Sequence, residues 1–317
     1  MKDSYGRKIE YLRISLTELC NLRCQYCMPA EGIAQKAHEE MLTEEELMVF
    51  LKICASRGVR KIRLTGGEPL VKKNILSICE KTANLTGIDE VCLTTNGVLL
   101  EKKAKDLKQA GVHRLNISLD TLNPEKFARI TRVGDFHQVW RGIEKSLECG
   151  FQKIKLNTVL MGNVNDDEIE DLVKLTFMYP IEVRFIEWMP MGCAREMKKV
   201  EFLPVSIVTK RIPQLKKIDN NGGVASLYRL DGALGEVGLI SPVSNHFCAA
   251  CNRLRLTADG YIKPCLHLPA EFSIKGKTSI EMEAILDTVL QNKPEKHEEL
   301  SKEHESNAGR HMYAIGG

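Results

Sequence analysis

The chain has 317 residues, of which 43% are hydrophobic and 27% charged, and its formal net charge is +3. These ordinary globular values exclude wholesale disorder and collagen-like repeats, and a charge so near balance is not typical of a nucleic-acid binder. The sequence contains no uncharged apolar run of the ~18 residues that a membrane-spanning helix needs, and its first residues lack a signal core. We therefore expect a cytoplasmic protein that contacts neither a membrane nor a nucleic acid.

The first 190 residues alternate between short β-rich runs and helical segments. A capping box, Thr43-Glu44-Glu45-Glu46, begins one helix, and Gly58 ends it. Strands separated by helices imply right-handed crossovers and a parallel sheet. We therefore predict an α/β fold with an incomplete (β/α)6 barrel as one domain over residues 1–200. The expected strands are 11–17, 61–65, 91–97, 114–120, 154–160 and 182–188, and further helices are expected at 101–110, 136–149 and 166–178.

Each expected strand has an apolar and a polar face, because successive side chains point to opposite sides of a sheet. If helices cover the apolar faces, then Arg13, Arg63 and Lys155 point into the barrel. Buried cations there need water or an anionic ligand. A half-solvated antiparallel sheet alternates in the same way, but the helical spacers argue against it. The sequence thus predicts a wet, cationic barrel interior.

The alternation of strands and helices ends after residue 200. Short strand-like runs follow at 225–230, 237–241, 253–257 and 261–265, and Ala258-Asp259-Gly260 is the expected hairpin turn between the last two. We predict a small β-rich C-terminal extension as a second domain over residues 201–317. Within it, the highly charged segment 291–305 is expected to be a solvated helix face or a mobile surface.

Six of the eleven cysteines fall into two triads. The first, Cys20-x3-Cys24-x2-Cys27, follows the first strand, at the end where barrel enzymes build their active sites. Iron–sulfur clusters are ordinarily held by four cysteines, so three leave one iron open to a ligand. The other five cysteines are expected to be small buried packing residues.

The second triad, Cys248-x2-Cys251-x13-Cys265, spans the expected hairpin, so folding brings its members together. A second cluster with an open iron is one interpretation. A zinc site completed by His246 or His267 is the other, and the residues alone leave both open.

These motifs resemble the radical S-adenosylmethionine (SAM) enzymes, whose hallmark is the Cys-x3-Cys-x2-Cys loop after the first strand of a partial barrel. Gly66-Gly67-Glu68-Pro69, after the second strand, matches the motif that meets the methionine amino group of SAM. The spacing of the second triad, Arg253-Leu254-Arg255 and the Gly-Gly C-terminus narrow the resemblance to the GTP 3′,8-cyclase family of molybdenum cofactor biosynthesis. The match runs along essentially the whole chain.

The resemblance implies two [4Fe–4S] clusters and SAM as cofactors. A 5′-deoxyadenosyl radical takes the 3′ hydrogen of GTP, and the sugar carbon then attacks C8 of guanine. The product is (8S)-3′,8-cyclo-7,8-dihydroguanosine 5′-triphosphate, the first intermediate of molybdopterin synthesis.

The same resemblance assigns site residues by position. Cys20, Cys24 and Cys27 hold the catalytic cluster, and Cys248, Cys251 and Cys265 hold the second one. SAM meets Tyr26, Gly67, Ser118 and Met189, although the sequence alone favours Met189 as a core residue. GTP meets Arg13, Arg63, Thr94, Lys155, Arg253, Leu254 and Arg255. The tail, with Arg310, Gly316 and Gly317, reaches into the active site in the family; without the resemblance it would be a frayed end.

The resemblance also implies a flavodoxin- or ferredoxin-like electron donor, a downstream cyclic pyranopterin monophosphate synthase, and a homodimer. One alternative within the superfamily is a peptide-maturation enzyme with an auxiliary cluster, although such extensions usually contain more cysteines. A two-cluster electron-transfer or metal-storage protein leaves the missing fourth ligands unexplained. A zinc-ribbon nucleic-acid module does not suit the charge or the long α/β region.

Overall fold

The computed structural model describes residues 1–219, 223–300 and 306–316 of the chain. Six strands form the parallel centre of its sheet and pair side by side in chain order, which confirms the barrel strands and excludes the antiparallel alternative. They are β1 (Tyr11–Ser15), β2 (Lys61–Thr65), β3 (Glu90–Thr95), β4 (Arg114–Ser118), β5 (Ile154–Leu160) and β6 (Ile181–Glu187).

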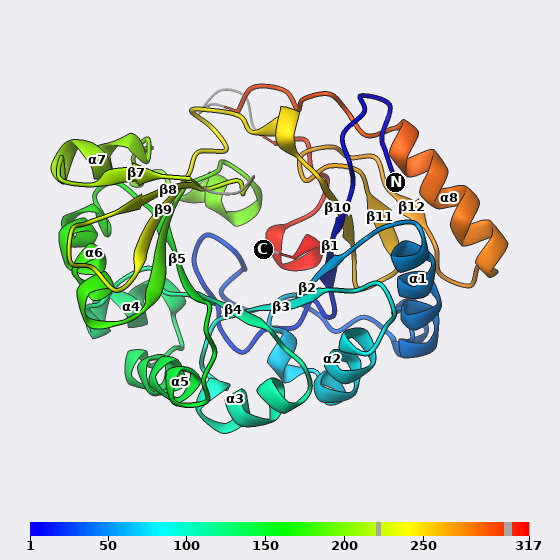
Figure 1. The fold of residues 1–317 in the computed structure, drawn as a ribbon, viewed down its shortest axis with the longest axis horizontal. Helices are drawn as coiled ribbons and strands as arrows, with labels where there is room; N and C mark the ends of the chain where they lie inside the picture. Colours follow the sequence, from blue (N-terminus) through cyan, green and yellow to red (C-terminus); the bar gives the residue numbers. More distant parts are fainter. Residues whose placement is uncertain (220–222, 301–305, 317) are drawn as a thin grey trace.

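Helices cover the outside of these strands (Figure 1). The capping box forms as expected, since Thr43 Oγ1 accepts from the Glu46 amide at 3.2 Å and Glu46 Oε2 accepts from the Thr43 amide at 2.9 Å. The helices are α1 (Glu44–Ser56), α2 (Ile75–Ala83), α3 (Leu100–Gln109), α4 (Pro124–Thr131), α5 (Phe136–Glu148) and α6 (Ile169–Met178). Of these, α2 and α4 lie outside the predicted helices; α4 is short and begins at an Asn-Pro cap. Single 3-10 turns lie at His38–Glu40, Pro69–Val71, Asp166–Glu168 and Gly192–Glu196.

The C-terminal strands continue the same sheet at both of its edges. In the described residues the sheet has twelve strands in the order β12-β11-β10-β1-β2-β3-β4-β5-β6-β9-β8-β7. Strand β10 pairs in parallel with β1, and β9 pairs in parallel with β6. The added elements are α7 (Ser206–Arg211), β7 (Lys216–Ile218), β8 (Ser226–Arg229), β9 (Glu236–Ile240), a 3-10 turn at Cys248–Ala250, β10 (Arg253–Leu256), β11 (Tyr261–Lys263), β12 (Phe272–Ser273), α8 (Ser279–Gln291) and α9 (Met312–Ile315). The two-domain division at residue 200 stays a prediction.

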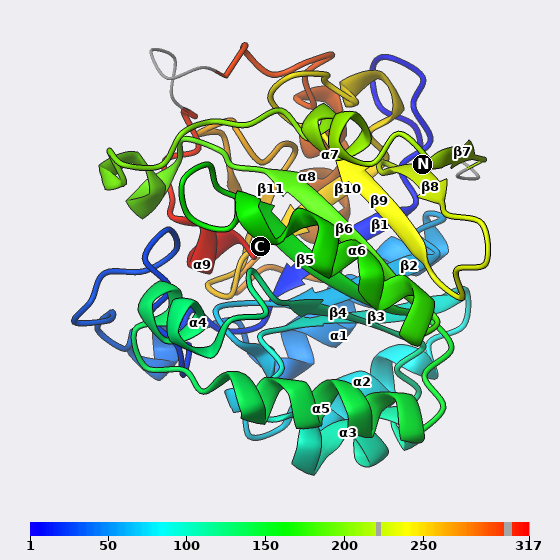
Figure 2. The same cartoon turned by 90° about the vertical axis from the view of Figure 1, so that its left-hand side faces the viewer.

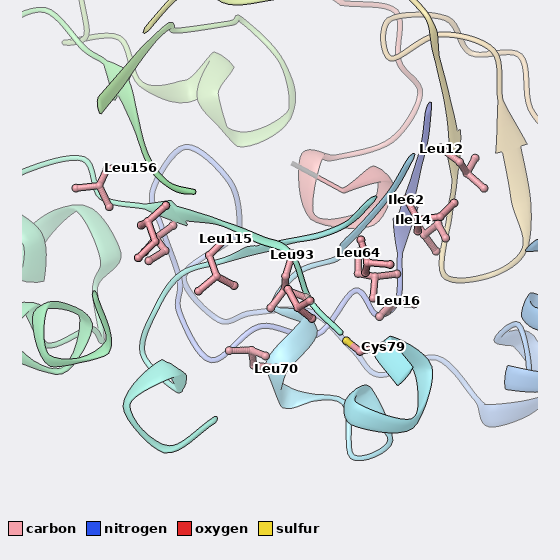
Figure 3. Packing of buried hydrophobic residues seen from close by; sticks show 14 of the residues in the cluster. Leu12, Ile14, Leu16, Ile62, Leu64, Leu70, Cys79, Leu93, Leu115 and Leu156 are labelled. Atoms are coloured by element: carbon pink, nitrogen blue, oxygen red, sulfur yellow. The ribbon is translucent and has the colours of Figure 1, made fainter. Parts of the chain in front are cut away.

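The main core lies between the sheet and the outer helices. Leu12, Ile14 and Leu16 are at most 4% exposed and belong to one cluster with the apolar side chains of β2, β3, β4 and β5 and of α1 and α2, part of which Figure 3 shows. The predicted separation of apolar and polar strand faces is therefore confirmed, and the polar faces point to the barrel interior.

The chain's last described segment returns to the centre of the fold. Helix α9 lies inside the ring of strands (Figure 1), and the side view also places it within the barrel (Figure 2). By contrast, the prediction of a solvated face over 291–305 is wrong for Lys293, His297 and Leu300, which are 2%, 8% and 6% exposed. The helix ends at Gln291, and the following segment packs against the second cysteine loop; residues 301–305 lie outside the described part.

Candidate active site inside the barrel

Strand register lines up arginines from distant parts of the sequence. Arg13 on β1 is paired with Arg255 on β10 and with Arg63 on β2, so the three form one row across neighbouring strands. Two residues earlier, Tyr11 is paired with Arg253 and Lys61. The sheet thus gathers the cations of two sequence regions on one patch of the barrel wall.

The guanidinium groups of this arginine row are buried and lie close enough to one another to repel. Burial, and then the charge of Arg255, lower the pKa of Arg13 well below its usual value. Burial and Arg253 lower the pKa of Arg255 to about 10. Like charges at this density repel, so an anion at the row would be stabilised by every member.

Tyr11 and Thr94 orient Arg63. The Tyr11 hydroxyl accepts from Arg63 Nε, and Thr94 Oγ1 accepts from Arg63 Nη1 at 3.2 Å. The Tyr11 ring also stacks near Arg253, at 5.8 Å from ring centroid to guanidinium carbon. Burial alone would raise the pKa of Tyr11, but the arginines around it lower it.

The opposite wall carries a second, compensated group of charges. Lys155 and Arg184 both bind the Glu182 carboxylate, which is 8% exposed as a residue. Burial and the nearby Arg184 nevertheless lower the pKa of Lys155 to about 8. This lysine therefore titrates near physiological pH.

The first cysteine loop is anchored to the end of α4. The amide of Gln25 donates to Ile130 O at 2.9 Å, and Arg132 Nη1 donates to Met28 O at 2.9 Å. Within the loop, the Cys27 amide donates to Cys24 O at 2.9 Å, which turns the chain back on itself. Burial and mutual repulsion raise the pKa of the thiols of Cys24 and Cys27.

Two glycines let the second strand's loop approach the cysteine loop. A Cβ on Gly66 would lie 2.6 Å from Thr17 O, and one on Gly67 would lie 2.4 Å from Leu19 O. Glu68 then accepts from the Asn96 amide at 2.7 Å and from Thr95 Oγ1 at 2.8 Å, tying this loop to the end of β3. The Gly-Gly-Glu-Pro motif thus fixes the backbone that presents Cys20.

The interior faces of β4 and β5 hold polar atoms that lack partners in the part of the chain that the structure describes. Asn116 Oδ1 and Asn157 Oδ1 are buried and have no hydrogen-bond partner within the described ranges. They lie on the same strand faces as Ser118 and Lys155. Nearby, Tyr26 donates to Asp120 Oδ2 at 2.8 Å. Three thiols in one loop fit an iron–sulfur cluster, and buried polar groups without partners on the interior faces of β4 and β5 fit a polar cofactor such as SAM.

The second triad lies at the other end of the strands. Cys248 and Cys251 precede β10, and Cys265 follows β11. Because β10 runs parallel to β1, the start of β10 lies beside the start of β1. It is therefore at the far end of the strand pair from the residues that lead to Cys20. Burial alone would raise the pKa of the Cys251 thiol, but the cations of Lys293 and Arg253 lower it. Three thiols in one loop region again fit a cluster.

The C-terminal tail occupies the space beside the arginine row. Arg255 Nη1 donates to Gly316 O at 2.6 Å and to Ile315 O at 3.3 Å. At the root of the tail, Arg310 binds Glu271 with two hydrogen bonds of 2.7 Å and Asp259 with one of 2.8 Å. Arg310 is thereby an anchor of the tail, and Gly317 lies outside the described residues.

The structure brings most of the predicted residues around one interior. Met189 is partly buried and packs against the small apolar cluster of Met191, Ala308 and Ile315, which joins it to the tail. Leu254 differs, because its side chain is 1% exposed and belongs to the main core. Leu254 is paired with Leu12 across β10 and β1, so its side chain lies on the opposite sheet face from Arg253 and Arg255. Sequence reasoning missed Tyr11, Arg184 and Lys293; strand alternation could have found the first two, but no sequence signal marks Lys293.

Neither a single-ion metal site nor a membrane-spanning helix is present in the described part of the chain. Among residues 1–219, 223–300 and 306–316, no three His, Cys, Asp or Glu side chains converge as they would around a single metal ion. None of the helices in these ranges is long and apolar enough to cross a bilayer.

Comparison with known proteins places this site in a family. The profile of the radical SAM superfamily matches residues 14–176, and that named Molybdenum Cofactor Synthesis C matches residues 181–299. The GTP 3′,8-cyclase of Alkaliphilus oremlandii is 47% identical over 100% of both chains. That of Peptoclostridium acidaminophilum is 47% identical over 99% of this chain and 98% of its own, and one from Clostridium botulinum is 44% identical over 100% of both.

Solved structures agree on the fold. Streptococcus suis SuiB bound to its precursor peptide SuiA has a TM-score of 0.63 and 15% identity, covering 88% of this chain and 65% of its own. Methylornithine synthase (PylB) has a TM-score of 0.52 and 17% identity, covering 65% and 63%. The full-length relatives, the two matching profiles and the two cysteine triads agree, and the chain is a member of the GTP 3′,8-cyclase family within the radical SAM superfamily.

Proposed function

We propose that this chain is a GTP 3′,8-cyclase that joins the sugar C3′ of GTP to C8 of its guanine, the first step of molybdenum cofactor biosynthesis. Relatives of that name are 43–47% identical over 95–100% of this chain. The observation that carries the proposal is the row of Arg255, Arg13 and Arg63, set by strand register between the two cysteine loops. Buried guanidinium groups bind phosphate oxygens in pairs, so a triphosphate is the ligand that suits this row.

The two triads would hold two [4Fe–4S] clusters, the first through Cys20, Cys24 and Cys27 and the second through Cys248, Cys251 and Cys265. When bound, the first cluster and SAM supply the hydrogen-abstracting radical chemistry of the superfamily. Asn116 and Asn157 offer buried acceptors to a polar cofactor next to Ser118. Tyr26, held by Asp120, orients the cysteine loop toward that space.

The remaining residues bind the nucleotide and close the barrel. Lys155 adds a cation on the opposite wall, and Tyr11 holds Arg63 in its orientation. The tail, held by Arg255 at its tip and by Arg310 at its root, excludes water from the interior. Met189 packs against that tail, so SAM and tail would meet at the same place.

Anaerobic turnover with SAM and GTP tests the proposal. We expect one 5′-deoxyadenosine for each cyclised GTP product, identified by mass. Cys20→Ser should abolish SAM cleavage, because the first triad loses a ligand. Arg13→Ala should weaken GTP binding far more than it slows SAM cleavage, since Arg13 lies in the phosphate-binding row. SAM cleavage without a GTP-derived product, or only with an added peptide, would overturn the assignment in favour of peptide maturation.

We further propose the partners that follow from this reaction. The first cluster needs a low-potential electron donor, which we take to be flavodoxin- or ferredoxin-like. The product would pass to a cyclic pyranopterin monophosphate synthase. A homodimer in a reducing, cytoplasmic compartment completes this set of predictions.

A further inference from the structure

Lys293 is buried directly behind the second cysteine loop. Its residue exposure is 2%. Its Nζ donates to Arg253 O at 2.9 Å, to Pro264 O at 2.8 Å and to Cys251 Sγ at 3.6 Å. An ammonium group has three protons, and these three partners use all of them.

The partners of Lys293 belong to both arms of the β10–β11 hairpin. Arg253 begins β10, two residues after Cys251, and Pro264 follows β11, immediately before Cys265. One side chain therefore fixes the spacing between the two cysteines that are far apart in sequence.

Within residues 1–219, 223–300 and 306–316, the charge of Lys293 has no carboxylate counterpart. Among the described residues, no Asp or Glu oxygen lies within 4.0 Å of its Nζ; the partners are two carbonyl oxygens and one sulfur. A buried cation without an anion is costly. A metal-bound cysteine is a thiolate, so a ligated Cys251 supplies the missing negative charge.

The segment around Lys293 also contacts the flanks of the other two cysteines. Arg7 donates to Cys248 O at 2.8 Å and, from the same guanidinium group, to Glu295 O at 2.8 Å. The ring of His297 lies 4.4 Å from that of His267, two residues beyond Cys265. Residues 293–297 therefore lie along the second cysteine loop, with Arg7 linking them to Cys248, and Lys293 is their contact with a sulfur.

We propose that Lys293 is a positioning residue of the second cluster: it holds the hairpin at the spacing that Cys251 and Cys265 need, and its charge raises the reduction potential of that cluster. The inference rests on the proposed function, in which the second triad holds a cluster. Hydrogen bonds to ligand sulfurs and nearby charge are two of the factors that set such potentials. A cation favours the reduced state because reduction adds a negative charge.

The experiment compares Lys293→Met and Lys293→Arg in the full chain after anaerobic reconstitution. Methionine keeps much of the volume but has neither charge nor donor, whereas arginine keeps both. Iron content and a redox titration followed by electron paramagnetic resonance are measured for each. Added SAM identifies the first cluster, which serves as the internal reference. Lys275→Met is the control, because Lys275 also donates to a backbone carbonyl, Met41 O at 2.8 Å, away from the cysteines.

We expect Lys293→Met to shift the midpoint potential of the second cluster to more negative values, or to lose about four irons per chain, while the first cluster is unchanged. Lys293→Arg should restore the potential at least in part, and Lys275→Met should leave it in place. Full iron content with an unchanged potential in Lys293→Met would refute the inference. So would an equal shift in Lys275→Met. A native chain that binds only about four irons would instead refute the second cluster itself.

Where Lys293→Met does not fold, Lys293→Gln decides. Glutamine keeps a donor for the carbonyl oxygens but carries no charge. A second cluster of native potential in Lys293→Gln would refute the charge effect, and a more negative potential would support it.

Discussion

Replacing Gly316 by alanine should displace the C-terminal tail from the barrel. Gly316 has φ +77°, and a Cβ there would lie 2.4 Å from Thr65 Cγ2. Its carbonyl oxygen accepts the 2.6 Å hydrogen bond from Arg255 Nη1. The tail therefore enters the site at a position that a side chain can occupy only if the tail, β2 or the Thr65 side chain shifts.

The cost has two parts that the structure separates. An L-residue in the left-handed region costs about 1–2 kcal/mol. Adding a carbon to a packed site costs about 1–3 kcal/mol more. Together they shift the docking equilibrium of the tail by about 2–5 kcal/mol, which is roughly 30-fold to several thousand-fold.

Hydrogen exchange of the tail peptide, read by mass spectrometry, measures docking directly, and GTP turnover measures its consequence. We expect Gly316→Ala to exchange faster at residues 312–316 and to lose turnover. Gly6→Ala is the matched control, since Gly6 has the same φ of +77° but nothing within 4 Å of its would-be Cβ. Adding Thr65→Ser removes the clashing methyl and should recover part of the protection. Unchanged exchange in Gly316→Ala would refute the reasoning.

Two further predictions concern the opposite wall and the outer helices. Because the pKa of Lys155 is lowered to about 8, its charge is present below that pH, so anaerobic calorimetry should show GTP affinity falling as pH rises through 8. Lys155→Arg, which stays charged, should abolish that decline, and a decline retained in this variant would exclude Lys155 as its source. Thr43→Ala removes the cap of α1 and should lower the free energy of unfolding by about 1 kcal/mol in urea denaturation, with GTP affinity intact; an unchanged midpoint would contradict the cap.

Much of the site follows from local sequence signals. Period-two alternation by itself assigns Arg13, Arg63 and Lys155 to the interior face of the barrel, and the observed strand register agrees with that assignment. Such patterns report the direction of a side chain relative to its own strand. They carry no information about which distant strand lies beside it.

The row of three arginines shows that limit. Arg13 and Arg255 are neighbours only because β10 pairs with β1, a contact between residues more than two hundred positions apart. Lys293 shows it again: in sequence it belongs to a charged, hydrophilic run, and its burial depends on carbonyl oxygens and a sulfur that folding brings to it. A charged run in a sequence predicts exposed lysines because water usually solvates the ammonium group. In this fold two carbonyl oxygens and one sulfur replace water around Lys293.

The parallel pairing of β1 with β10 explains why the extension continues the barrel sheet. Cys20 follows the end of β1, whereas Cys251 precedes the start of β10, so the two cysteine loops lie at opposite ends of neighbouring strands. Arg253 is paired with Tyr11, four residues before the end of β1 at Ser15, so a rise of ~3.3 Å per residue separates those ends by roughly 13 Å. The arginine row lies between them. A nucleotide held by this row would extend toward both cysteine loops. The first loop would then act on the sugar, while the second would fix the base. An antiparallel β10 would bring both triads to the same end and leave the row outside them.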